Sequence, residues 1–128
     1  MKIIKLSQEE NKKWIGVDLD GTLAEYDSWI GPENIGKPIG KMVDRVERWI
    51  DEGKTVKILT ARVAHAFGKE EAKKSRKYIR EWLIDVFGED GEKIEITCVK
   101  DQKMEELWDD RAISIKKNTG EIYLPQES

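Results

Sequence analysis

The chain has 128 residues, with 26 acidic and 23 basic side chains, a net charge of −3 and a single cysteine. The mixed charges argue against a general polyanion binder, the lone cysteine excludes an intrachain disulfide, and no apolar run approaches membrane-spanning length. We therefore expect one domain over residues 1–128 that is soluble and cytoplasmic, with neither a signal nor a transit peptide at its start.

The N-terminal part of the chain leads into a short acidic motif. Lys2–Leu6 can form a strand or an ordered arm, and the polar stretch Ser7–Lys13 predicts a turn. A strand is expected over Trp14–Asp18, where an apolar run meets Asp18 and Asp20, and a Gly-Thr pair follows. Side chains two apart on a strand point the same way, and open α/β sheets bind ligands at the carboxyl ends of their strands. Two such carboxylates favour a hard cation such as Mg²⁺, although a surface turn would also explain the pattern.

The next stretch, residues 19–38, predicts a flap beside the end of this strand. Its glycines and prolines break regular structure, and it is too short to be a domain. Tyr26 and Trp29 either anchor the flap by packing, or one of them stacks on a flat substrate group such as a nucleobase.

A βαβ unit is expected around this flap. Lys41–Glu52 has apolar residues at helical spacing, and a strand over Thr55–Leu59 follows after a short joint. A strand, a helix and a strand joined in this way pair in parallel with a right-handed crossover. Thr60, at the end of the second strand, should therefore lie at the same edge as Asp18.

The middle of the chain predicts a loop and a long helix. The loop over Val63–Gly68 contains His65, the only histidine, which either touches substrate or has no special role. The helix over Lys69–Phe87 carries a run of basic residues that forms either a basic patch or simply its solvated side: Lys73, Lys74, Arg76, Lys77 and Arg80.

The last part of the chain predicts one more strand and a hairpin. A turn over Gly88–Lys93 precedes a strand over Ile94–Val99, whose alternation places Cys98 in the core. A brief helical turn over Gln102–Glu106 then leads into Leu107 and Trp108. A terminal β-hairpin is expected over residues 112–124, because Asn and Gly at its centre tolerate positive φ.

The expected strand ends carry residues that suit phosphate chemistry: Asp18 with Asp20, Thr60, Lys100, and Asp109 with Asp110. A carboxylate can attack phosphorus, Mg²⁺ can bridge a carboxylate and a phosphate oxygen, and a hydroxyl or an ammonium can bind the other oxygens. Each residue also has an ordinary explanation, as a helix cap, an edge charge or a turn. Their shared position at strand ends favours a single phosphoryl-transfer site.

The motifs that carry these residues resemble, in their order, the four motifs of the haloacid dehalogenase-like hydrolase superfamily: Asp18–Thr22, Leu59–Arg62, Val99–Asp101 and Trp108–Arg111. The likeness spans residues 14 to 111. It implies a three-layer, Rossmann-like α/β fold, with a parallel sheet flanked by helices. A large cap domain is not expected, because neither the flap nor the interval filled by the long helix has room for one. Capless members often act on large substrates or complete their pocket by oligomerising, so a homo-oligomer is one expected arrangement.

Carried over to this sequence, the resemblance makes Asp18 the nucleophile and Asp20 the general acid, which later acts as the base that activates water. It implies that Asp18, the backbone carbonyl of Asp20, and Asp109 hold Mg²⁺. Asp110 would be a second ligand through water, or would orient the motif lysine. An acid at the position of Asp20 is the phosphatase pattern of the superfamily.

The resemblance also assigns substrate contacts. Thr60 and Lys100 would bind the phosphoryl group, while Arg62 and Arg111 either guide the substrate or form ordinary salt bridges. The Asp-Asp-Arg and Thr-Ala-Arg motifs are similar to those of polynucleotide kinase 3′-phosphatase domains and small deoxyribonucleotidases. The expected function is a Mg²⁺-dependent phosphomonoester hydrolase with an aspartyl-phosphate intermediate, acting on a nucleotide or a nucleic-acid end.

Other functions stay open. The chain can be a non-catalytic module that binds phosphate or a partner on the same fold, or a phosphatase of sugar phosphates or phosphoglycolate. A response-regulator receiver also forms an aspartyl phosphate, but the position of both acids at a strand end favours a hydrolase.

Overall fold

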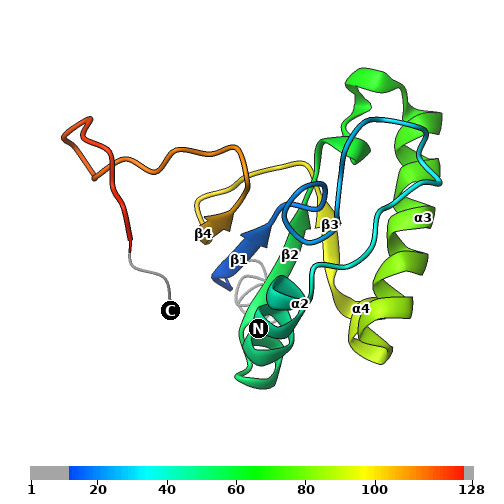
Figure 1. The fold of residues 1–128 in the computed structure, drawn as a ribbon, viewed down its shortest axis with the longest axis horizontal. Helices are drawn as coiled ribbons and strands as arrows, with labels where there is room; N and C mark the ends of the chain where they lie inside the picture. Colours follow the sequence, from blue (N-terminus) through cyan, green and yellow to red (C-terminus); the bar gives the residue numbers. More distant parts are fainter. Residues whose placement is uncertain (1–11, 126–128) are drawn as a thin grey trace, which may run out of the picture.

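A parallel four-stranded sheet forms the centre of the molecule (Figure 1). The computed structural model describes residues 12–125, so the strand or arm expected at Lys2–Leu6 and most of the predicted turn Ser7–Lys13 lie outside the described residues. The strand order is β3-β2-β1-β4, and every neighbouring pair is parallel. In chain order the strands are β1 (Trp14–Val17), β2 (Thr55–Leu59), β3 (Glu95–Thr97) and β4 (Met104–Trp108). The predicted parallel α/β sheet is therefore confirmed.

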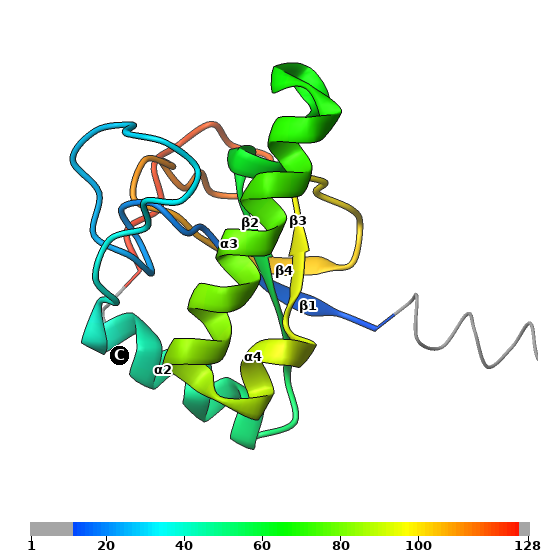
Figure 2. The same ribbon diagram turned by 90° about the vertical axis from the view of Figure 1, so that its right-hand side faces the viewer.

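Two helices, α2 (Gly40–Asp51) and α3 (Lys69–Phe87), pack on the same face of this sheet (Figure 2). Their bounds match the helices predicted for these segments to within one residue. Because the crossovers β1-α2-β2 and β2-α3-β3 step across the sheet in the same direction, one handedness puts both helices on one side. One hydrophobic core joins the strands to both helices, and its members include Ile15, Val17, Val56, Ile58, Ile96, Val46, Trp49, Ile79 and Leu83.

The opposite face of the sheet carries Trp14, Gly16 and Lys57. The Lys57 ammonium lies 4.6 Å from the centre of the Trp14 ring, and Trp14 Nε1 donates a hydrogen bond of 2.9 Å to Asp101. A Cβ atom at Gly16 would lie 2.9 Å from the sulfur of Met104, so glycine permits the close packing of β1 and β4 there. Within residues 12–125 no helix covers this face, and the described part of the chain forms two layers rather than the expected three.

The edge strand β4 differs from the prediction, which placed a helical turn over Gln102–Glu106. That prediction is wrong, because Met104–Trp108 pairs in parallel with β1. The two glutamates of this segment are exposed, so it lacks the apolar alternation that marks a half-buried strand. Backbone hydrogen bonds with β1 outweigh the local preference, and the chain leaves β4 beside the end of β1.

The segment around β3 also differs from the prediction. Glu89–Lys93 forms a short helix, α4, instead of a turn, and Arg80 Nη1 donates to the carbonyl oxygens of Gly91 and Ile94 at 2.6 and 2.7 Å. The strand β3 is shorter than expected because the Thr97 side chain accepts a hydrogen bond from the backbone N–H of Val99, which turns the chain. Cys98 is therefore exposed, and its predicted place in the core is wrong.

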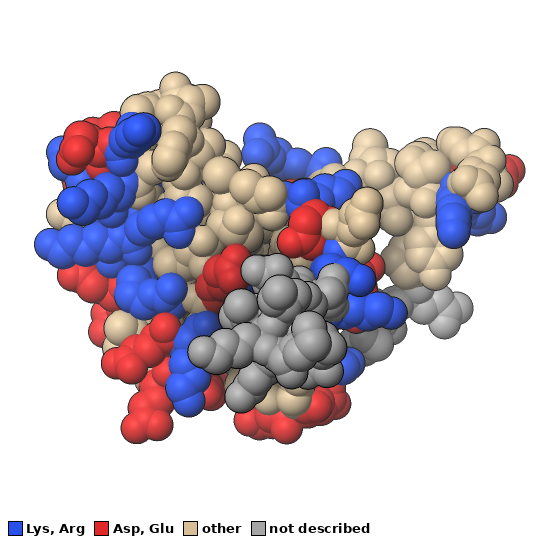
Figure 3. Space-filling view, turned by 180° about the vertical axis from the view of Figure 1, so that it is seen from behind, with Lys and Arg blue, Asp and Glu red and all other residues tan. Residues whose placement is uncertain are grey.

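The basic run on α3 is partly structural. Arg76 donates to the carbonyl oxygen of Ile96 at 2.7 Å, and Arg80 binds the end of α4. Basic and acidic side chains lie close to one another along the α3 side of Figure 3, and Lys74 pairs with Glu71 at 3.7 Å. These contacts favour a solvated helix face over a dedicated basic patch.

The flap over residues 19–38 closes on itself and is bound to α3. Glu25 N donates to Lys37 O at 2.8 Å, and Trp82 of α3 donates through Nε1 to Gly36 O at 3.0 Å. Tyr26 and Trp29 are 45% and 53% exposed, so neither side chain is a buried packing anchor.

The residues after β4 extend away from the sheet as an arm, drawn orange to red in Figure 1. The predicted hairpin is present here as a single antiparallel bridge between Ile115 and Ile122, with Asn118 at a φ of 67° in its turn. The arm's large apolar side chains are exposed: Ile113, Ile115, Ile122, Tyr123 and Leu124. Among residues 12–125, no helix has both the length and the apolar character needed to cross a bilayer.

Candidate metal centre

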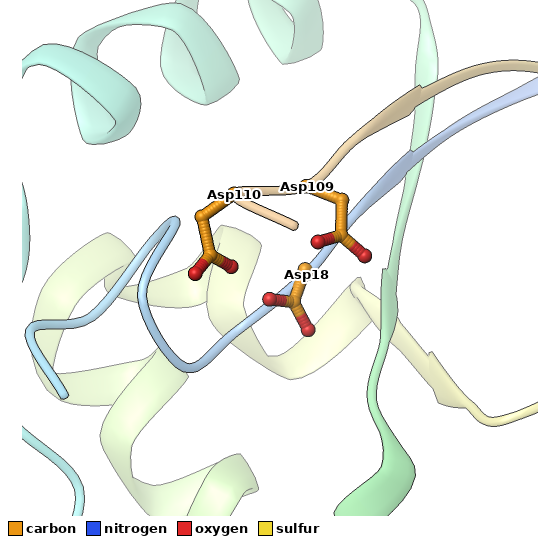
Figure 4. A group of neighbouring side chains, drawn as sticks. All are labelled: Asp18, Asp109 and Asp110. Atoms are coloured by element: carbon orange, nitrogen blue, oxygen red, sulfur yellow. The ribbon is translucent and has the colours of Figure 1, made fainter. Parts of the chain in front are cut away.

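Three carboxylates converge at the carboxyl ends of β1 and β4 (Figure 4). Asp18 follows β1, while Asp109 and Asp110 follow β4. The register aligns the two strand ends, because Val17 pairs with Trp108 and Asp18 N donates to Trp108 O at 2.9 Å. One oxygen atom from each carboxylate lies within 4.8 Å of the other two. The sequence predicted this meeting of residues that are 91 and 92 positions apart.

Thr22 ties the two strand ends together. Its hydroxyl oxygen accepts a hydrogen bond of 2.9 Å from the backbone N–H of Asp110. The hydroxyl proton has two acceptors, Asp110 Oδ1 at 3.2 Å and Asp18 Oδ2 at 3.4 Å. The buried threonine thus fixes the carboxylates relative to one another, since it contacts both.

Gly21 makes room for the cluster. Its φ is +89°, a conformation that residues with a side chain rarely adopt, and a Cβ atom there would lie 2.6 Å from Asp110 Oδ2. Glycine is therefore needed at position 21 for two reasons: the backbone has a positive φ there, and Asp110 lies too close to leave room for a side chain.

The electrostatics of the cluster show that it carries an excess of negative charge. The pKa of Asp18 is raised from 3.8 to about 7, chiefly by burial, and also by the charge of Asp109, a hydrogen bond with Asp110 and the charges of Asp110 and Asp20. A carboxylate with a raised pKa among other acids is a common sign of a functional site. A cation placed among these oxygens would stabilise the ionised form of all three.

The donor set fits a hard divalent cation. Asp18 and Asp109 are half-buried and Asp110 is exposed, so an ion would be held from one side and open to solvent or substrate on the other. Mg²⁺ prefers one or two carboxylates and keeps its remaining positions for water and phosphate oxygens. Asp18, Asp109 and Asp110 are the residues that would hold it.

Asp20 lies outside this cluster and is paired with Arg62. Both of its carboxylate oxygens accept from the guanidinium, at 2.7 Å from Nε and 2.9 Å from Nη2. Arg62 is buried and also donates to two flap carbonyls, Pro32 O at 3.3 Å and Asn34 O at 2.9 Å. The salt bridge that the sequence left open for Arg62 is thus present, and it joins the acidic motif to the flap.

Among residues 12–125, no side-chain hydrogen bond or ion pair joins the remaining predicted site residues to the carboxylate cluster, although the backbone N–H of Arg111 donates to Asp109 Oδ1 at 2.8 Å. Thr60 is buried at the end of β2, where its side chain accepts from Arg62 N at 3.2 Å and caps a short 3₁₀ turn. Lys100 lies exposed in the loop after β3, two strands away from β1. Arg111 is exposed directly after Asp110, and His65 is exposed in a second 3₁₀ turn, His65–Phe67.

Two features of the site were not predicted from the sequence. Thr22 was recognised only as part of a turn, although a hydroxyl two residues after a pair of acids is a suitable donor to them. The pairing of Asp20 with Arg62 had one available signal: each residue lies two positions beyond the first polar residue at the end of neighbouring parallel strands.

Comparisons of the chain with protein-family models, with curated proteins and with solved structures found no match.

Proposed function

We propose that this protein is a Mg²⁺-dependent phosphomonoester hydrolase with a haloacid dehalogenase-like catalytic centre. The observation that carries the proposal is the meeting of Asp18, Asp109 and Asp110 at the carboxyl edge of a parallel sheet. In open α/β sheets this edge is where ligands bind, and it is the position that the motif order implies. Residues 12–125 form two layers. The three-layer architecture of that superfamily is therefore proposed for this protein and is not observed in the described residues.

In the proposed reaction, an oxygen of Asp18 attacks the phosphorus of the substrate. The bond from phosphorus to the ester oxygen breaks, and its electron pair stays on the leaving oxygen, which takes a proton from Asp20. Water then attacks the phosphorus of the aspartyl phosphate and gives its proton to Asp20, which releases inorganic phosphate and restores Asp18. Bound Mg²⁺ would neutralise the charge of the carboxylates and of the phosphoryl oxygens.

Binding of the phosphoryl group falls to the polar residues at neighbouring strand ends. Of these residues, Thr60 is the best placed to bind the phosphoryl group, because it follows β2 and β2 is the direct neighbour of β1. The side chains of Lys100 and Arg111 are exposed, so substrate is the partner we propose for both of them. Arg62 acts through Asp20 rather than on phosphate, because four hydrogen bonds already engage its guanidinium.

One observation favours a second candidate, a non-catalytic module that binds phosphate or a partner. Both oxygens of Asp20 accept from Arg62, whereas a proton donor needs one oxygen directed at the substrate. A binding module would keep the metal cluster and would not need Asp20 to be available.

The test is hydrolysis of a panel of phosphate esters with Mg²⁺ and with EDTA. The panel contains p-nitrophenyl phosphate, mononucleotides, 3′-phosphorylated oligonucleotides, sugar phosphates and phosphoglycolate. The proposal expects Mg²⁺-dependent turnover that Asp18→Asn abolishes and that Asp85→Asn, on the exposed side of α3, leaves unchanged. Full Mg²⁺-dependent activity in Asp18→Asn would overturn the assignment of the nucleophile. Binding without turnover across the panel would favour the non-catalytic module.

We also propose a second copy of the chain as a partner. The exposed isoleucines of the arm, Ile113, Ile115 and Ile122, support this proposal, because apolar side chains gathered on a projecting segment are typical of interaction sites. The mass of the protein in solution tests it, and a strictly monomeric protein at high concentration would contradict it.

A further inference from the structure

The flap carries an exposed tryptophan, Trp29, near the carboxyl edge of the sheet. We call this edge, which carries Asp18, Asp109 and Asp110, the catalytic edge. Trp29 is 53% exposed, and the guanidinium carbon of Arg62 lies 4.8 Å from the centre of its ring. One part of the ring surface therefore contacts Arg62, while more than half of the residue remains open to solvent. Burial in the core does not explain this placement, because other flap residues, such as Leu23 and Ile35, pack against the core.

The position of this indole is fixed by the same side chain that binds Asp20. Only 4% of the Arg62 side chain is exposed. Its hydrogen bonds to Asp20 and to the carbonyl oxygens of Pro32 and Asn34 hold the guanidinium plane in place. Trp29 is therefore attached to the catalytic edge through one rigid group, although it belongs to an otherwise irregular flap.

The chemistry of the pair suits a flat, electron-rich ligand. A cation over an aromatic ring is attracted by the ring's quadrupole and draws electron density toward itself. Stacking of a planar heterocycle on the remaining ring surface then has both dispersion and electrostatic contributions, and such stacking does not depend on base identity. The guanidinium of Arg62 contacts both Asp20 and Trp29, so it links the indole to the acidic motif whose first residue, Asp18, belongs to the cluster.

We infer that Trp29, held by Arg62, is a stacking platform for a nucleobase carried by the phosphorylated substrate. The inference deepens the proposed phosphatase function and rests on it for the position of the phosphate. It names a substrate class, a phosphomonoester next to a nucleobase, which free nucleotides and nucleic-acid ends share.

The experiment measures binding in the Asp18→Asn protein with Mg²⁺, because removal of the attacking carboxylate keeps the ligand intact. The probes are adenosine 5′-monophosphate and ribose 5-phosphate, which differ by the base. Base stacking contributes about 1–3 kcal/mol, so the nucleotide should bind about 5- to 160-fold more tightly. Trp29→Ala in this background should abolish the preference, and Trp29→Phe should retain part of it.

Matched controls separate this site from the other exposed aromatic residues. Tyr123→Ala, on the terminal arm, should leave the preference unchanged. Loss of the preference in Tyr26→Ala with retention in Trp29→Ala would overturn the assignment, and so would equal binding of glucose 6-phosphate and the nucleotide. Equal melting temperatures of the Trp29 variants and their parent show that the fold is intact.

The outcomes also distinguish this inference from the proposed function. A preference that depends on Trp29, with no turnover of any phosphate by the unmodified protein, would support the platform and overturn the phosphatase. Turnover with no preference for the base-bearing probe would overturn the platform alone. A 3′-phosphorylated dinucleotide that also loses affinity in Trp29→Ala would extend the platform to nucleic-acid ends.

Discussion

Substitution of Gly21 by alanine tests whether the acidic motif and Asp110 are packed as tightly as the structure shows. The new Cβ atom would lie 2.6 Å from Asp110 Oδ2 and 2.8 Å from its Cγ. Asp110 cannot easily withdraw, because its backbone N–H and its carboxylate both contact Thr22. The variant must therefore bear the strain of a positive φ and also displace Asp110.

The two costs have different sizes and can be separated. An alanine held at positive φ costs about 1–2 kcal/mol, and disruption of a hydrogen bond with Thr22 costs about 1 kcal/mol more. Gly53→Ala is the matched control, because Gly53 has a φ of +82° and nothing lies within 4 Å of its added Cβ. We expect Gly53→Ala to lose about 1–2 kcal/mol and Gly21→Ala about 2–3 kcal/mol.

The assay is thermal or denaturant unfolding of both variants, each also made in an Asp110→Ala background. A loss of 1 kcal/mol corresponds to about 3–6 °C in the melting temperature for a chain of this size. In the Asp110→Ala background, the excess cost of Gly21→Ala over Gly53→Ala should disappear, because contacting residues are not additive. Equal costs of the two alanines in the unmodified background would refute the close contact between Gly21 and Asp110.

Further predictions concern the charge cluster, the flap and the arm. Without a divalent cation, the free energy of unfolding should fall as pH rises from about 4 to about 7, because the raised pKa of Asp18 keeps a proton bound in the folded state after the unfolded chain has released it. After a discount for solvent screening the loss is on the order of 1–2 kcal/mol, and Asp18→Asn should remove it from the pH-dependent unfolding curve. For the same reason Mg²⁺ should raise the melting temperature more at pH 8 than at pH 5.5; an equal effect at both values would mean that the ion binds elsewhere. Trp82→Phe should cost about 1 kcal/mol through the lost bond to Gly36 O and should speed proteolysis within the flap, whereas an unchanged cleavage rate would show that this bond does not hold the flap. If a second copy of the chain covers the arm, Ile115→Lys should convert the oligomer to a monomer and so lower the particle mass measured in solution. An unchanged mass would show that the arm does not form the interface between copies.

The elements that could be predicted from the sequence are those whose side chains have a one-sided apolar pattern. The bounds of β2 and α3 match the structure, because Thr55–Leu59 and Lys69–Phe87 each bury one regular face in the core. The strand β4 lacks such a pattern. It is kept extended by its pairing with β1 and not by the burial of its own side chains. Pairing between distant segments is not encoded in local periodicity, and for this reason a helical turn was expected there.

The candidate site shows the same division. The convergence of Asp18 with Asp109 and Asp110 could be predicted, because parallel strands bring their carboxyl ends to one edge. The link from Asp20 through Arg62 to the flap could not, because it depends on how the flap folds back on that edge. The predicted burial of Cys98 is wrong for a related reason. The apolar alternation in the sequence continues past the point where Thr97 turns the chain.

The most direct test of the central claim is a crystal structure of the protein grown with Mn²⁺, whose anomalous signal locates the ion. The account predicts a single strong peak in direct contact with carboxylate oxygens of Asp18 and of Asp109 or Asp110, and its loss when Asp109 and Asp110 are both replaced by asparagine. A peak bound elsewhere, or an unbound cluster at millimolar Mn²⁺ and pH 8, would contradict the assignment of these three carboxylates as a metal centre.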